Sequence, residues 1–372
     1  MRFSEVVGHA ELKEKLINEV NNNHVSHAQL FVGKAGYGVL PIALAFVQYL
    51  FCENKQGTDS CGECQSCKKV AKLQHPDLHF SFPTVQAISK ISDGLISEWR
   101  EKIGENPYFD LNGWVKYMDP KERKPIIGKD ESQEIIKKLN LRSFEGGYKV
   151  MMIWMAEEMN QSSANKLLKI LEEPPGNTVF ILMADSEEMM LQTILSRTQK
   201  VRIPRINMED MSMYLREYKN QSPGSADSIT ARVDGDLVEA LEFLGDHAEQ
   251  DENREQFIQL MRVCYKKSVL DMMDWSETIG QKSREFQKVF LKYALHMFRQ
   301  SLLKNYTEDT LTRVSDEEEA FLEKFARFIT GNNIGSFLET FSDAHYHIER
   351  NANPKILFTQ LCFEVMRYIH KA

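Results

Sequence analysis

The sequence predicts an α/β domain with a parallel sheet, followed by a region built of helices alone. In the first 205 residues, short apolar runs of strand length alternate with amphipathic helical patterns. Such alternation is typical of a parallel sheet with helices on both faces. After Pro204 the apolar residues recur with a helical period and the strand signals almost disappear. The fold class is therefore α/β, with an all-α remainder.

Each expected strand is a buried apolar run, such as QLFVG, VMMIW or TVFILMA. The predicted strands span residues 29–33, 150–154, 178–184 and 199–203. Helices are expected between them at 42–51, 131–139 and 162–173. The last helix stops before Pro174-Pro175, because proline cannot continue a helix.

The all-α remainder divides into two parts by helix length. A small unit of three short helices precedes several longer amphipathic helices, with a linker expected near residues 245–251. The short helices are expected at 208–218, 225–233 and 236–244, and the longer ones include 285–304, 316–329 and 354–369. We therefore expect three domains, at residues 1–205, 206–250 and 251–372.

The composition is that of a globular protein. Of 372 residues, 42% are hydrophobic and 27% are charged, which excludes a disordered, collagen-like or small disulfide-rich chain. No apolar run is long enough to span a bilayer and no signal-peptide core is visible, so we expect a cytoplasmic protein without membrane contact. The net charge of −8 gives no global attraction to nucleic acid.

Four of the six cysteines form a cluster in the run CENKQGTDSCGECQSC, at Cys52, Cys61, Cys64 and Cys67. Four thiolates from overlapping C-x-x-C turns can close a tetrahedral site around Zn²⁺, which would then be structural. The alternatives are a chance group of free thiols and a redox C-x-x-C. Cys264 and Cys362 stand alone in apolar helical stretches and are expected to be buried core thiols.

A glycine-rich loop follows the first strand, with Gly33, Gly36 and Gly38. A strand, glycine loop and helix in this order cradle phosphates in P-loop proteins, whose pattern is G-x-x-x-x-G-K-[ST]. Val39 and Leu40 replace the lysine and the hydroxyl residue here. The loop therefore lacks the groups that hold the β/γ-phosphates and magnesium. We therefore expect no ATP as cofactor, and we expect the glycines to serve only a tight turn.

The strand at 150–154 gives a second indication of the same kind. A magnesium-binding strand of a P-loop ATPase would end in Asp-Glu, but this one ends in Trp154 and Met155. Glu157 and Glu158 come later and are expected to form a solvated face.

Several strings together resemble the bacterial clamp-loader family of AAA+ proteins. They are FSEVVGH, SHAQLFVGKAGYG, the cysteine cluster, SSANKLLKILEEPPGNTVFIL, ILSRTQKVRI and, near the end, IERNANPKILF. The resemblance covers the first 205 residues and implies an AAA+ domain with a zinc module at about 52–67. By length and position, residues 206–250 fit the family's lid and residues 251–372 its oligomerising collar.

The resemblance implies a subunit of the DNA polymerase III clamp loader, in a hetero-oligomer with gamma/tau and delta subunits. That assembly places the sliding β-clamp on primed DNA during replication. The degenerate loop favours a non-hydrolysing member over an ATP-hydrolysing gamma/tau-like motor, which remains the first alternative. A zinc-dependent nucleic-acid-binding protein is the second, and the acidic balance opposes it.

The same resemblance implies a role for Arg197 and its motif partner Ser196. In the family this arginine reaches, as an arginine finger, the γ-phosphate of ATP bound by the neighbouring subunit. The cysteine that usually follows is Thr198 here. In the alternative interpretation, Arg197 merely pairs with a surface carboxylate.

Residues 84–124 fit no part of the family pattern and are expected to be an insertion. A helix is predicted at about 92–103, with an irregular loop after it. The segment holds several aromatic residues, which could bind a partner if they are exposed, or else decorate the fold.

Overall fold

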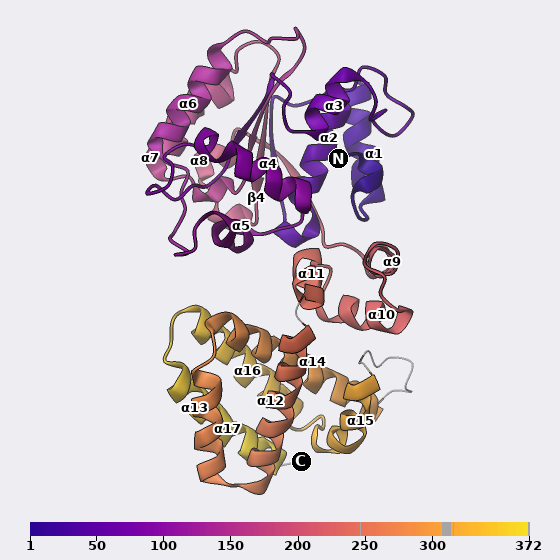
Figure 1. Cartoon of the computed structure of the whole chain (residues 1–372), viewed down its shortest axis with the longest axis vertical. Helices are drawn as coiled ribbons and strands as arrows, with labels where there is room; N and C mark the ends of the chain where they lie inside the picture. Colours follow the sequence, from indigo (N-terminus) through magenta and orange to yellow (C-terminus); the bar gives the residue numbers. More distant parts are fainter. Residues whose placement is uncertain (246, 307–313, 315, 371–372) are drawn as a thin grey trace. The chain divides into compact units, whose positions relative to one another are not determined.

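The structure is a computed structural model that describes residues 1–245, 247–306, 314 and 316–370 (Figure 1). The chain forms two compact units. The first contains residues 1–219 and 233–240, and the second contains residues 220–232 and 241–372. The expected division into three domains remains a prediction, because this grouping divides the short helices between the two units.

The first unit is built on a parallel sheet with the strand order β2-β3-β4-β1-β5. The strands are β1 Ala28–Val32, β2 Leu78–Ser81, β3 Lys149–Ile153, β4 Thr178–Ala184 and β5 Gln199–Arg202. This confirms the predicted parallel α/β fold, and it adds β2, which the sequence analysis missed.

Successive side chains of the central strands point to opposite faces of the sheet, and each face has its own apolar core. On one face, Phe31, Met152 and Ile181 pack in a core with α1 and α2. On the other, Leu30, Met151 and Phe180 pack in a core with α6 and α7. Figure 1 shows these helix pairs on either side of the strands.

The helices of this unit follow the predicted order, with several additions. They are α1 Ala10–Asn21, α2 Val39–Phe51, α3 Gln65–Ala71, α4 Ile96–Glu105, α5 Leu111–Met118, α6 Lys129–Asn140, α7 Gln161–Glu172, α8 Gln192–Leu195 and α9 Met208–Lys219. Helix α2 begins three residues before the expected position, because Gly38 ends the preceding turn in the left-handed region at φ 88°. Pro41 then lies in the first turn, where a proline is tolerated.

The insertion is a folded part of this unit and not an irregular loop. Backbone hydrogen bonds between Thr84 and Ile126 close its base, at 3.1 and 3.0 Å. Helix α5 lies where a loop was expected. The alternative of an exposed aromatic loop does not hold for its largest side chains, since Trp99 and Trp114 are fully buried.

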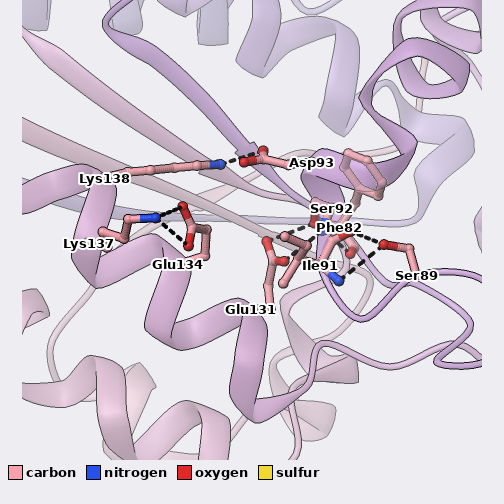
Figure 2. A network of polar contacts seen from close by, with 9 residues as sticks. All are labelled: Phe82, Ser89, Ile91, Ser92, Asp93, Glu131, Glu134, Lys137 and Lys138. Atoms are coloured by element: carbon pink, nitrogen blue, oxygen red, sulfur yellow. Dashed lines mark hydrogen bonds and ion pairs between the residues drawn. The ribbon is translucent and has the colours of Figure 1, made fainter.

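A polar network ties the insertion to helix α6 (Figure 2). The buried Glu131 accepts the Ser92 backbone N–H at 2.7 Å, and its other oxygen lies 2.8 Å from the Ser92 hydroxyl. Burial raises the pKa of Glu131. The Ser92 hydroxyl also lies 3.1 Å from the Phe82 carbonyl oxygen, to which it donates. This network fixes the point where the insertion enters its first helix.

The second unit is helical in the part of the chain that the structure describes. Its helices are α10 Pro223–Arg232, α12 His247–Lys266, α13 Val269–Gly280, α14 Arg284–Tyr306, α15 Asp316–Phe325, α16 Ile334–Glu349 and α17 Pro354–Ile369, while α11 Leu237–Gly245 begins in the first unit. This agrees with the predicted all-α region. The expected linker is shorter, because α12 already begins at His247.

The core of the second unit is rich in phenylalanine, with Phe298 stacked on Phe337 at 4.5 Å between ring centroids. Cys264 and Cys362 are buried in it, as predicted. No helix among the described residues is long and apolar enough to cross a membrane.

Replacing Trp99 with alanine should destabilise the first unit by about 3–5 kcal/mol, because it empties a fully buried aromatic site. Urea unfolding of the full chain measures this. Phe144→Ala, at a side chain that is 81% exposed, is the control and should change stability by less than about 0.5 kcal/mol. Equal effects of the two changes would contradict the placement of the insertion in the core.

Candidate functional site

The four clustered cysteines converge at one point beside α2 and α3. Their sulfur atoms all lie within 4.8 Å of one another. The Sγ atoms of Cys52 and Cys61 are 3.6 Å apart, and those of Cys61 and Cys67 are 3.9 Å apart. Four sulfurs at ~2.3 Å from a tetrahedral ion would be separated by about 3.8 Å. The donor set therefore fits one metal ion, as the spacing predicted.

Backbone N–H groups already point at these sulfurs. Cys61 Sγ accepts the N–H groups of Glu63 and Cys64 at 3.4 and 3.3 Å, and these bonds lower the pKa of Cys61 to about 6. Burial instead raises the pKa of Cys52 and of Cys67. A bound cation would offset that burial effect by stabilising the thiolates. Gly62, at φ 73°, makes the turn between Cys61 and Cys64.

The glycine loop lies between β1 and α2, as the sequence predicted. Val39 and Leu40, which replace the phosphate-binding residues, are 4% and 3% exposed and belong to the core on the α2 face. They are packing residues, and neither side chain offers a polar atom to a phosphate. A Cβ on Gly36 would lie 1.6 Å from Asp236 Oδ1, so the loop is also closely packed from outside.

The residues after β3 give no magnesium site of the expected kind. Trp154 is 3% exposed and packs on Trp99 and Phe109, with ring centroids 5.1 and 5.3 Å apart. Met155 adopts a left-handed conformation at φ 51° and turns the chain into the next short helix.

Glu157 corrects one expectation, because it is not part of a solvated face. One of its oxygens accepts the Asp185 backbone N–H at 2.8 Å, and burial raises its pKa to about 7. Burial also raises the pKa of Asp185 to about 6, and the charge of Asp110 adds to that effect. The sequence analysis missed Asp185. Its place directly after β4, at the carboxyl edge of the sheet, was the available signal.

Arg197 lies just after α8, near the end of α7. Its side chain is 30% exposed and forms an ion pair with Glu172, with Nε 2.6 Å from Oε1. One terminal nitrogen donates to the Ser196 hydroxyl at 3.1 Å and to the Thr193 carbonyl at 3.0 Å. The contact with Glu172 is the surface pairing that the alternative interpretation expected. Ser196 and Arg197 therefore lie together at this surface.

The first unit is thus a parallel α/β unit whose glycine-rich loop between β1 and α2 is followed by Val39 and Leu40, where the P-loop pattern has a lysine and a hydroxyl residue. The family described as "DNA polymerase III, delta subunit" matches residues 8–207. That is more than half of the chain, and the chain therefore belongs to this family.

Relatives point the same way. The DNA polymerase III subunit delta' of Bacillus subtilis is 28% identical over 252 residues, which cover 68% of this chain and 64% of that protein. The delta' subunit of Escherichia coli is 30% identical over 50% of this chain and 44% of that protein. The tau subunit of Bacillus subtilis is 23% identical over 100% of this chain and 62% of its own length. The chain thus spans less than two thirds of these relatives.

These matches confirm the resemblance to the clamp-loader family and, within it, to the delta-prime subunit. Solved structures are more distant. A gamma subunit-related protein of Thermotoga maritima aligns at 16% identity with a TM-score of 0.38. The alignment covers 96% of this chain and 100% of that protein's chain. A RuvB mutant of the same organism covers 86% of this chain and 89% of its own at 12% identity, with a TM-score of 0.41. Neither likeness adds to the assignment.

Glu157→Gln should make stability less dependent on pH. The folded pKa of Glu157 is raised to about 7 from 4.5, so the wild-type chain loses stability as the pH rises from about 4.5 through 7. The glutamine keeps the acceptor for Asp185 and removes the charge. We expect it to be as stable as wild type at pH 5 and more stable by about 2 kcal/mol at pH 8.5.

Urea unfolding at the two pH values checks this prediction. The matched control is Glu158→Gln, which removes a neighbouring charge that only adds to the raised pKa of Glu157 and should therefore change the pH dependence of stability less than Glu157→Gln does. A Glu157→Gln gain that is the same at pH 5 and pH 8.5 would refute a buried, titrating Glu157.

Proposed function

We propose that this chain is a non-hydrolysing, delta-prime-like subunit of the DNA polymerase III clamp loader. It would assemble with gamma/tau and delta subunits and help to load the sliding β-clamp on primed DNA. The observation that carries the proposal is the glycine loop with Val39 and Leu40 buried in the core, in a chain that belongs to this family.

The similarity to tau subunits does not by itself separate this role from that of an ATP-hydrolysing motor. The residues favour the non-hydrolysing role for two independent reasons. The loop offers no lysine and no hydroxyl, and the strand that should supply acidic residues supplies Trp154 to an aromatic core.

Co-purification tests the assembly role. The full chain, mixed with the gamma/tau and delta subunits of the same organism, should elute as one stable complex. If the chain stays apart from both partners at micromolar concentrations, the clamp-loader role has to be given up.

The cysteine cluster supports a structural zinc ion. Cys52 ends α2 and Cys64 caps α3, so a metal ion there would join two helices across a turn-rich segment. Four sulfur ligands leave no open position for water, and the ion would therefore have no catalytic role.

Purified full chain should contain about one zinc per molecule, and Cys64→Ser should lower that content because it removes one of four ligands. Mass spectrometry measures the zinc content of the wild-type chain and of the variant, and thiol titration shows whether the cysteines are reduced. Cys362→Ser is the control, since it changes a buried cysteine of the second unit and should leave the zinc content unchanged. Wild-type protein with reduced thiols and well under one zinc per chain would contradict the site.

Arg197 would act on ATP held by a neighbouring subunit. In the structure, Glu172 and Ser196 hold its guanidinium close to the protein surface. To reach a phosphate in another subunit, Arg197 would exchange the Glu172 carboxylate for two phosphate oxygens, which are also negatively charged and which its planar guanidinium can bind in a bidentate way.

Arg197→Ala should leave folding and assembly intact and slow DNA-stimulated ATP hydrolysis by the reconstituted complex. Arginine fingers contribute ~10³–10⁵ in rate at their own site, and the whole complex should lose less because its other sites keep theirs. Arg197→Lys should restore little, because an ammonium group cannot form the planar fork.

The control is Arg202→Ala, which removes an exposed arginine from the nearby strand β5 and should hydrolyse ATP at the wild-type rate. Steady-state hydrolysis with clamp and primed DNA is the measurement. Wild-type turnover by Arg197→Ala at saturating ATP would return Arg197 to an ordinary surface ion pair with Glu172.

A further inference from the structure

We propose that the insertion replaces the nucleotide, with the segment 108–110 lying where a ligand of the glycine loop would lie. The inference concerns a part of the chain for which the family resemblance gives no role. It rests on the proposed function only in treating the glycine loop as non-catalytic.

The topology of the parallel sheet indicates where a ligand of the glycine loop would bind. Ligands of open parallel sheets bind outside the carboxyl ends of the strands, and phosphates bind where a glycine loop leads into a helix. In this chain, those places are the loop before α2, the residue after β3 and the residue after β4. The segment 108–110 connects α4 to α5 and reaches all three.

Tyr108 covers the glycine loop. A Cβ built on Gly38 would lie 3.2 Å from the Tyr108 ring, so this ring lies directly against the last glycine of the loop. The Tyr108 hydroxyl accepts the buried Val7 backbone N–H at 3.0 Å. The residue therefore bridges the glycine loop and the N-terminal segment, and its own ring is 5% exposed.

The two residues that follow reach the strand ends. Phe109 packs on Trp154 after β3, with ring centroids 5.3 Å apart. Asp110 caps α5 by accepting the Gly113 N–H at 2.7 Å, and its charge acts on Asp185 after β4. Three consecutive residues thus contact or influence three separate parts of the ligand-binding edge.

The acidic side chains at this edge of the sheet disfavour the binding of a phosphate. The Asp185 carboxylate already accepts the Ala35 N–H of the loop, and Asp236 packs against Gly36. Glu157 lies beside Asp185. A nucleotide would have to displace the Tyr108 side chain and bring its phosphates next to these carboxylates. The positive charge of Lys34 lowers the pKa of Asp185 and so opposes the effect of burial on that carboxyl.

The consequence is a conformation that does not depend on nucleotide. In a nucleotide-binding unit, the ligand ties the loop to neighbouring segments only while it is bound. Here Tyr108 makes that connection through non-covalent contacts that are always available, because the side chain is part of the protein and cannot dissociate. The insertion would hold the N-terminal segment, the loop and the strand ends in one arrangement.

Amide hydrogen exchange on the full chain tests this inference, with Tyr108→Phe, Tyr108→Ala and the matched control Tyr117→Phe. Tyr117 belongs to the same insertion but stacks on Trp114. Tyr108→Phe removes only the acceptor and should make the Val7 amide exchange about tenfold faster. Tyr108→Ala should also speed exchange in residues 35–38 at least tenfold, whereas Tyr117→Phe should leave all these rates as in wild type.

Unchanged Val7 exchange in Tyr108→Phe would overturn the inference even if the alanine variant does not fold. Wild-type exchange at residues 35–38 in a folded Tyr108→Ala chain would overturn it as well. The second arm adds 1 mM ADP, with and without Mg²⁺, to the wild-type chain and should leave residues 33–38 unchanged. Protection of that loop by ADP would refute the insertion as a replacement for nucleotide, and would leave co-purification with the clamp-loader subunits unaffected.

Discussion

The burial of Trp154 at the carboxyl end of β3 is the constraint on which the rest of the nucleotide-like edge depends. Its ring packs between Trp99 and Phe109, and both belong to the insertion. A carboxylate at this position would be buried among aromatic rings without a cation, at a cost of several kcal/mol. Magnesium chemistry and this core therefore exclude each other. Trp154 and the folded insertion therefore depend on each other, because Trp154 packs on the aromatic residues of the insertion.

The glycine loop likewise has apolar core residues where a phosphate-binding loop has polar side chains. Val39 and Leu40 extend the α2 core to the first turn of the helix, where a phosphate-binding protein needs a lysine and a hydroxyl. Gly38 adopts a positive φ of 88°, which a tight turn before the helix requires. What remains is the shape of a phosphate loop, stabilised by the protein's own side chains. Such a unit suits a subunit that presents surfaces to neighbours and keeps one arrangement while those neighbours bind and release nucleotide.

Local patterns predicted most of the fold, and long-range contacts account for what they missed. The strand TVFILMA and the final helix 354–369 were predicted with their observed bounds, because apolar run and period are local. The cysteine site was predictable because its ligands lie within sixteen residues of sequence. Strand β2 was missed because its four residues, LHFS, alternate apolar and polar side chains and form no apolar run like TVFILMA. The Glu172 partner of Arg197 and the Asp185 partner of Glu157 lie 25 and 28 residues away in sequence, so no local pattern could show these contacts.

We propose that this chain has the fold of a nucleotide-binding unit without a working nucleotide site. The most direct test restores the two missing loop residues, Val39→Lys and Leu40→Thr, and measures magnesium-dependent ATP turnover by the isolated chain, with a gamma/tau subunit as positive control. We expect turnover indistinguishable from background in both the wild-type and the restored chain, because Trp154 and the insertion still occupy the edge of the sheet. Turnover above background by the restored chain would contradict the claim, and turnover by the wild-type chain would contradict it outright.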